Sequence, residues 1–261
     1  MLRTRLLTAA VLLPAVGALI VFAPDWFFTI FVAIAAAWGL YEVAAMTGAL
    51  HLVAIPLFAV VGGVPLFGLL YGGDAGWLVP VLIILMMLAL VSRIAAAGAA
   101  GVSRGPRLVF IGAAYVGVLF PYFALLRNAP GGIGMLLLVI LLVVVSDSGA
   151  YFVGMYLGRT KLAPNVSPKK TIEGAAGGLI ATMAAGLLLF QIRGGTWHPV
   201  PALLFSAMIS LLAQLGDLAG SALKRAAGVK DSGWIFPGHG GLLDRTCSLV
   251  FAVVFAYYWS R

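Results

Sequence analysis

IGMLLLVILLVVVSDSGAYFVGMYL, residues 133–157, carries one charged side chain, Asp147, in a run dominated by Leu, Ile and Val. At 1.5 Å per residue, a helix of this length crosses the roughly 30 Å hydrocarbon core of a bilayer. The whole chain has this character, since 63% of its residues are hydrophobic and 9% are charged. Helices satisfy their own backbone hydrogen bonds in lipid, so the expected fold class is an all-α, polytopic integral membrane protein.

Apolar runs of similar length recur along the chain and predict about nine transmembrane helices. Their expected bounds are 5–23, 27–47, 52–70, 77–92, 108–127, 133–157, 172–192, 200–223 and 244–260. No stretch remains for a separate soluble domain, so we expect one integral membrane domain over residues 1–261. Within it, 1–130 are mainly apolar spans, and 131–261 hold the polar spans and cytoplasmic loops where a site is expected. The basic and apolar start is interpreted as a retained first helix, because Pro24 follows the only small-residue cleavage site.

Basic residues gather on one side of this predicted topology. If the N-terminus faces the cytoplasm and the spans alternate, all 16 basic residues except Arg127, Arg193 and Arg261 lie inside. This asymmetry follows the positive-inside rule and predicts a cytoplasmic N-terminus and cytoplasmic polar loops. The net charge of +8 then requires no nucleic acid partner, because topology and anionic lipids account for it. A single cysteine excludes an intramolecular disulfide and a multi-cysteine zinc site.

Three carboxylates, Glu42, Asp147 and Asp217, fall inside predicted spans. Each costs about 2.5–3.5 kcal/mol near the centre of a bilayer, and such a cost usually signals a function. The alternative is that these carboxylates lie at helix ends in contact with water.

Polar side chains also share faces on three predicted spans. The sets are Gln214, Asp217, Ser221 and Lys224 on the eighth span, Asp244, Cys247 and Ser248 on the ninth, and Asp147 with Tyr151 on the sixth. Helical geometry places each set on one side of its helix. Three helices could therefore direct carboxylates into one cytoplasm-facing polar cavity, where hard oxygen ligands suit Mg²⁺.

The connection GRTKLAPNVSPKKTIEG, residues 158–174, places four cations before a predicted helix. They are Arg159, Lys161, Lys169 and Lys170, followed by Thr171 as the expected N-cap. A helix N-terminus flanked by lysines suits a phosphate chain. The alternative is an ordinary basic loop on the cytoplasmic side.

A membrane site with carboxylates, several cations and no evident nucleophile favours phosphoryl or nucleotidyl transfer in which one substrate is itself the nucleophile. A cation-coupled transporter has similar intramembrane carboxylates and Gly/Pro-broken helices. From the residues alone, both functions remain open.

The segment SALKRAAGVKDSGWIFPGHGGLLDRTCSLV, residues 221–250, resembles the signature of the phosphatidate cytidylyltransferase (CDP-diacylglycerol synthase) family. The matching positions are Ser221, Lys224, Arg225, Lys230, Asp231, Pro237, His239, Gly240, Gly241, Asp244 and Arg245. Three upstream stretches also look like motifs of this family: SDSGAYFVGMYLGR, LAPNVSPKKTIEG and QLGDLAGS. The resemblance covers roughly residues 146–250, whereas the N-terminal spans match only in being apolar.

The resemblance implies a Mg²⁺-dependent nucleotidyltransferase that forms CDP-diacylglycerol and pyrophosphate from CTP and phosphatidic acid, in phospholipid biosynthesis. Whether the reaction also requires a second cation is left open. The resemblance also implies a homodimer in a bacterial-type inner membrane, with its active site facing the cytoplasm. Phosphatidic acid carries a phosphate monoester whose second ionisation lies near neutrality, as in phosphoserine at about 6, so its oxygen can attack without a strong base.

Carried over by position, the resemblance implies Asp217 and Asp244 as metal-binding carboxylates. Its implied catalytic residues are Asp217, Asp244, Lys224, Arg225, His239 and Arg245. Its implied substrate-binding residues are Asp147, Ser167, Lys169, Lys170, Thr171, Glu173, Ser221, Lys230 and Asp231. His239 could donate to a phosphate, protonate the leaving group or fix the turn, and these three roles stay open.

One position departs from the family pattern, because Cys247 stands where the family has a second aspartate. A thiol is a poor substitute for a carboxylate on hard Mg²⁺. Asp217 and Asp244 could suffice for the metal, the substitution could impair catalysis, or the position could only have oriented a water. A small residue packed on a helix face is the plain alternative. An impaired family member, a transporter and an enzyme acting on another lipid phosphate therefore remain alternatives.

Overall fold

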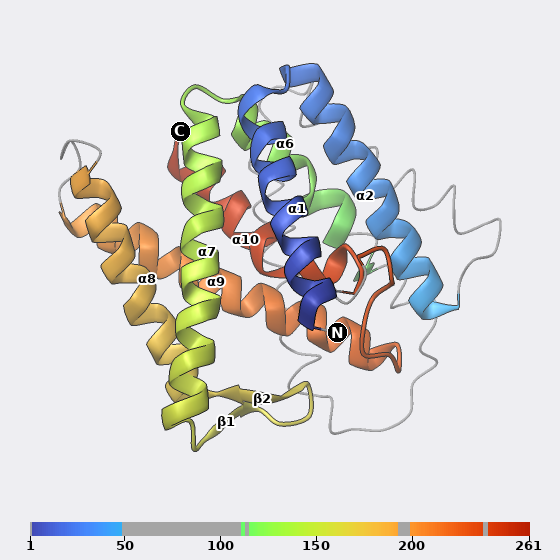
Figure 1. Ribbon diagram of the computed structural model, residues 1–261, viewed down its shortest axis with the longest axis vertical. Helices are drawn as coiled ribbons and strands as arrows, with labels where there is room; N and C mark the ends of the chain where they lie inside the picture. The colour runs from blue at the N-terminus through green and yellow to red at the C-terminus, as the bar shows by residue number, and fades with distance from the viewer. Residues whose placement is uncertain (1, 49–110, 113–114, 193–198, 237–239) are drawn as a thin grey trace.

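The computed structural model describes residues 2–48, 111–112, 115–192, 199–236 and 240–261 (Figure 1). The spans predicted at 52–70 and 77–92 lie outside the described residues, as does the start of the span at 108–127.

The described part of the chain is mostly helical. Its helices are α1 (Leu2–Phe22), α2 (Asp25–Thr47), α6 (Pro121–Asn128), α7 (Gly132–Leu157), α8 (Ile172–Ile192), α9 (Pro199–Ala226) and α10 (Leu243–Trp259). The helices predicted at 5–23, 27–47, 133–157, 172–192, 200–223 and 244–260 are confirmed within a few residues. Helix boundaries follow from local chemistry. Pro121 begins α6, and Gly131 adopts a left-handed φ of 71° that separates α6 from α7.

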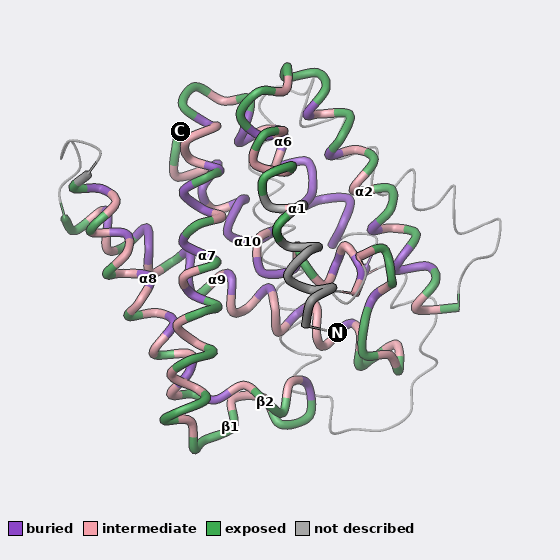
Figure 2. The backbone as a smooth tube through the Cα atoms, viewed as in Figure 1, coloured by how far each residue is buried: buried purple, intermediate pink, exposed green. Residues whose placement is uncertain are grey.

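Four described helices are long and apolar enough to cross a membrane. They are Asp25–Thr47, Gly132–Leu157, Ile172–Gln191 and Pro199–Ala226. Large apolar side chains such as Leu141 on α7 and Ile180 on α8 are exposed, as expected of surfaces that face lipid. In Figure 2, buried residues concentrate along α10, while α2 shows many exposed positions.

The all-α expectation needs one correction, because the connection between α7 and α8 forms a small sheet. Strands β1 (Lys161–Ala163) and β2 (Ser167–Thr171) pair antiparallel, with Lys161 opposite Thr171. Pro164 and Pro168 disfavour a helix here. The hairpin extends beyond the ends of α7 and α8 (Figure 1) and carries the lysines predicted to bind phosphate.

Close helix contacts at glycines set the framework around the hairpin. A Cβ atom at Gly177 of α8 would lie 2.4 Å from the Val153 side chain of α7. A Cβ atom at Gly216 of α9 would lie 2.2 Å from the carbonyl oxygen of Cys247 on α10. Small residues thus let α7, α8, α9 and α10 approach closely, as in other membrane helix bundles.

Candidate functional site

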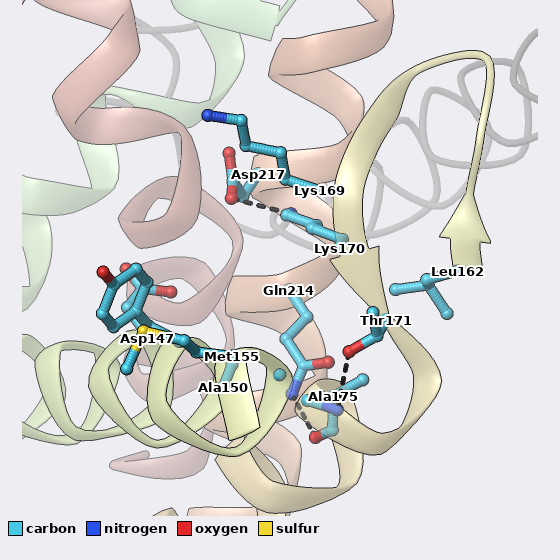
Figure 3. Close-up of a pocket in the computed structure, with 13 residues that line it drawn as sticks. Asp147, Ala150, Met155, Leu162, Lys169, Lys170, Thr171, Ala175, Gln214 and Asp217 are labelled. Atoms are coloured by element: carbon cyan, nitrogen blue, oxygen red, sulfur yellow. Dashed lines mark hydrogen bonds and ion pairs between the residues drawn. The ribbon is translucent and has the colours of Figure 1, made fainter. Parts of the chain in front are cut away.

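A cavity of about 350 Å³ opens where the hairpin meets the C-terminal part of α7, the start of α8 and the interior of α9 (Figure 3). Its lining combines charged, amide and small residues: Asp147, Ala150, Tyr151, Gly154, Met155, Leu162, Lys169, Lys170, Thr171, Gly174, Ala175, Gln214 and Asp217. Asp147, Lys169, Lys170, Thr171 and Asp217 are among the residues predicted from the sequence. The structure therefore brings the sixth span, the basic connection and the eighth span together, whereas the ninth span, whose Asp244 was expected in the same cavity, contributes no residue to this lining.

An ion pair crosses this cavity. Nζ of Lys170 lies 2.7 Å from Oδ2 of Asp217, with the two side chains 27% and 36% exposed. Figure 3 shows Lys170 reaching Asp217 from the hairpin. Both groups are accessible to a ligand from the cavity, so the pair can open to accept an anion on the lysine and a cation on the aspartate.

Asp147 extends the charged lining on the α7 side. Its carboxyl group interacts electrostatically with Asp217, Lys170 and Arg245. Gln214 lies between the helices, where its Nε2 donates to the carbonyl oxygen of Ala175 at 3.1 Å. The polar face predicted on the eighth span therefore enters the cavity at Gln214 and Asp217.

The base of the hairpin is fixed by the start of α8. Oγ1 of Thr171 accepts a 3.1 Å hydrogen bond from the backbone nitrogen of Gly174, which confirms the predicted N-cap. The Glu173 carboxylate accepts hydrogen bonds of 3.1 Å from the backbone nitrogens of Arg159 and Thr160. Glu173 does not line the cavity; its contacts anchor the segment that presents Lys169 and Lys170.

A second charged cluster forms where α9 ends and α10 begins. Nζ of Lys224 donates to Oδ1 of Asp244, and these side chains are only 14% and 5% exposed. Oδ2 of Asp244 accepts from the backbone nitrogens of Ser232 and Gly241, at 2.8 and 2.9 Å, and from the Ser232 hydroxyl at 3.1 Å. Asp244 thus holds the loop before α10 as well as Lys224, and neither residue lines the larger cavity.

Cys247 lies between the two clusters. Its buried thiol is 3.8 Å from Oδ1 of Asp217 and 3.9 Å from the carbonyl oxygen of Asp244. A Cβ atom at Gly220 would lie 2.8 Å from Cβ of Cys247, so the position is also tightly packed. The proximity to Asp217 agrees with the expectation that the polar faces of the eighth and ninth spans meet, and the packing agrees with the plainer alternative.

The carboxylates suit a hard cation in part. Asp217 offers an accessible carboxylate, whereas the two oxygens of Asp244 already receive the Lys224 ammonium and the backbone N–H groups of the loop, beside the Ser232 hydroxyl. Within the described ranges, no group of three or more His, Cys, Asp or Glu side chains is arranged to hold a metal ion. That Asp217 and Asp244 together hold a metal ion stays a prediction.

The remaining predicted residues are not among those that line the cavity. Arg225 is exposed and donates to the carbonyl oxygen of Val229 at 3.0 Å. Lys230, Asp231 and Arg245 are exposed, and Ser167 and Ser221 are half-buried. His239 lies outside the described residues.

Sequence reasoning missed the partners of Asp244 in the loop, above all Ser232, and the buried contacts of Glu42. The same Ser232 hydroxyl is 2.7 Å from Oε2 of Glu42. The only signal in the sequence was that Glu42 is a carboxylate in an apolar span.

A family model described as "Cytidylyltransferase family" matches residues 3–261 of the chain. The phosphatidate cytidylyltransferase of Bacillus subtilis is 43% identical over 154 residues, which cover 58% of this chain and 56% of that protein. Phosphatidate cytidylyltransferases of Staphylococcus haemolyticus and Synechocystis sp. are 43% identical over 140 residues and 42% identical over 134 residues. These two matches cover 54% and 51% of this chain, and 53% and 45% of the relatives. The chain thus spans about half the length of the curated relatives it matches.

Proposed function

The chain belongs to the Cytidylyltransferase family, and from that premise we propose that it is a phosphatidate cytidylyltransferase, a multi-pass membrane enzyme of phospholipid biosynthesis. Its reaction converts CTP and phosphatidic acid to CDP-diacylglycerol and pyrophosphate. The observation that carries the proposal is the cavity of about 350 Å³ in which Lys170 and Asp217 face each other. Opposite charges at one cavity suit a substrate whose phosphates arrive with a cation.

The chemistry needs positioning more than a protein nucleophile. A phosphate oxygen of phosphatidic acid forms a bond to the α-phosphorus of CTP, and the bond from that phosphorus to the bridging oxygen breaks. Pyrophosphate leaves with the electron pair. In this proposal Lys169 and Lys170, which line the cavity, hold phosphate oxygens and offset the charge that develops on them.

Mg²⁺ is the proposed cofactor; Asp217 would hold it, and Asp244 would contribute the second carboxylate only by giving up its contact with Lys224. When bound, it neutralises charge on the triphosphate and on the departing pyrophosphate. To hold the cation, Asp217 must release its ion pair with Lys170. The released Lys170 ammonium is then free to bind a phosphate. Asp244 keeps the start of α10 in place through its loop contacts.

The proposed setting is a bacterial-type inner membrane, with the N-terminus and the cavity on the cytoplasmic side and the enzyme acting as a homodimer. Support for the orientation comes from the basic residues of the hairpin and of the α9–α10 connection, which the positive-inside rule assigns to the cytoplasm. CTP is cytoplasmic in this arrangement, while phosphatidic acid enters from the membrane.

Direct synthesis tests the proposal. The full chain in detergent micelles with phosphatidic acid, labelled CTP and Mg²⁺ should release one pyrophosphate for each CDP-diacylglycerol formed. Replacing phosphatidic acid by another lipid phosphate separates this acceptor from its nearest alternatives. Absence of labelled lipid, together with CTP-independent solute flux in proteoliposomes, would favour a transporter and overturn the proposal.

Cys247→Asp should tighten the response to Mg²⁺. The thiol lies 3.8 Å from Oδ1 of Asp217, so an aspartate would add a second carboxylate beside it. We expect the half-saturating Mg²⁺ concentration to fall by about tenfold. Without Mg²⁺, repulsion between the two carboxylates should lower the melting temperature.

Cys247→Asn is the matched control, because it has nearly the shape of aspartate without the charge. Turnover is measured against Mg²⁺ concentration for the parent and both variants. Equal Mg²⁺ dependence in all three proteins would argue against any metal role for this position.

A further inference from the structure

Glu42 is a buried carboxyl group that the proposed reaction does not use. It lies near the C-terminal end of α2, yet its exposed fraction is 2%. Glu42 does lie near a helix end, but it is shielded from water, so the alternative of a carboxylate in contact with water is wrong for this residue. A carboxyl group shielded from water is costly unless hydrogen bonds compensate, so its partners reveal its role.

Four donors meet the two oxygens of Glu42. Oε1 accepts from Nε1 of Trp38 at 3.1 Å and from the backbone nitrogen of Leu242 at 2.7 Å. Oε2 accepts from the Ser232 hydroxyl at 2.7 Å and from the backbone nitrogen of Leu243 at 3.0 Å. Only Trp38 belongs to α2; the other three donors come from the loop and first turn of α10.

Glu42 supplies what the start of α10 lacks. Leu242 is the N-cap of this helix and makes no side-chain capping hydrogen bond. Backbone N–H groups at a helix start have no partner within the helix, and a carboxylate there also interacts favourably with the helix dipole. Glu42 takes this capping role from another helix, which contributes a long-range contact between α2 and α10 (Figure 1).

The same loop is held from its other side by Asp244. The Ser232 hydroxyl lies within hydrogen-bond distance of both carboxylates, 2.7 Å from Glu42 and 3.1 Å from Asp244. Gly241 is close to both as well: its backbone nitrogen donates to Asp244, and a Cβ atom there would lie 2.5 Å from Oε2 of Glu42. Displacing Glu42 therefore disturbs the donors that orient Asp244.

We propose that Glu42 is a positioning residue, which holds residues 229–236 and 240–242 of the loop and the first turn of α10 in the arrangement that turnover requires. It acts on the reaction through Ser232, Leu242 and Leu243, and it does not touch the substrates. The proposal rests on the proposed function, because Asp244 and Arg245 follow directly on this loop. It also gives α2, from the mainly apolar first half of the chain, a part in the site.

Glu42→Gln is the decisive variant. It keeps the size of the side chain but turns an NH₂ group toward a backbone N–H group that can only donate, so at least one of the four hydrogen bonds is lost. We expect kcat per folded molecule to fall by about 10–100-fold. We expect KM for CTP and for phosphatidic acid to change less than about threefold, because Glu42 is not one of the residues that line the cavity. Glu42→Ala should lose at least as much turnover.

The rate of trypsin cleavage at Lys230, measured in the absence of substrates, reports on how firmly the loop is held. Lys230 is exposed in this loop, and its cleavage in the full-length protein in detergent should be faster in Glu42→Gln than in the parent. Asp25→Asn is the matched control, because it changes another carboxylate of α2. Asp25 pairs with Arg127 and lies about 25 Å from Glu42 along the helix. This control should keep the parent values of kcat and of cleavage at Lys230.

The outcomes separate the two proposals. Parent values of kcat in folded Glu42→Gln, or parent cleavage at Lys230, overturn the positioning role. A loss confined to the yield of folded protein also overturns it, since that is the mark of a purely structural cap. If the parent itself forms no CDP-diacylglycerol, the proposed function fails, and the cleavage rates still decide whether Glu42 holds the loop.

Discussion

Asp244→Asn should abolish turnover and also lower the melting temperature, and adding Lys224→Met should restore the melting temperature alone. The Asp244 and Lys224 side chains are 5% and 14% exposed, so their ion pair is buried. Removing one partner of a buried pair costs about 3–5 kcal/mol, because the other charge is left without compensation. In Asp244→Asn, the amide can face the loop donors with its oxygen only by turning its NH₂ group toward the Lys224 ammonium.

The double variant separates folding from catalysis. With methionine at position 224, no cation remains to oppose the NH₂ group, and the asparagine oxygen still accepts from Ser232 and Gly241. Stability should therefore return, because an apolar partner of similar volume removes the uncompensated charge. Turnover should stay about 10²–10³-fold below the parent, since both charged groups are gone. Recovery of turnover together with the melting temperature would contradict any catalytic part for Asp244 and Lys224.

The contrast between the two charged clusters could not be predicted from the sequence. Helical spacing correctly placed Asp217 and Lys224 on one face of the eighth span. It could not predict that Asp217 faces an accessible cavity while Lys224 is buried against Asp244. Periodicity gives the direction of a side chain relative to its own helix, and the neighbour it meets depends on packing between helices.

Local signals predicted the cavity better than long-range contacts. The basic connection, the Thr171 N-cap and the carboxylates of two spans could be identified from short motifs, and the structure brings several of them together. The strands of the hairpin had no such signal, because they are short and lack an apolar alternation. Glu42 meets its loop across about 200 positions of sequence, and no local pattern encodes such a contact.

Asp217→Asn should remove turnover without destabilising the protein, in contrast to Asp244→Asn. The Lys170 and Asp217 side chains are 27% and 36% exposed, and accessible ion pairs contribute only about 0–1 kcal/mol to stability. The melting temperature should therefore stay close to that of the parent. Turnover should fall by about 10²–10³-fold, because the variant loses the accessible carboxylate that faces the cavity.

Lys170→Met supplies the complementary measurement. It also breaks the pair, but it leaves the Asp217 carboxylate intact and removes a cation proposed to hold phosphate. We expect its rate to fall while its response to Mg²⁺ persists, whereas Asp217→Asn should lose the Mg²⁺ response as well. A folded Asp217→Asn protein that keeps the parent rate and Mg²⁺ response would show that the carboxylate in the cavity only restrains Lys170. The metal assignment would then have to move to Asp147, which is the other carboxylate of the described cavity lining.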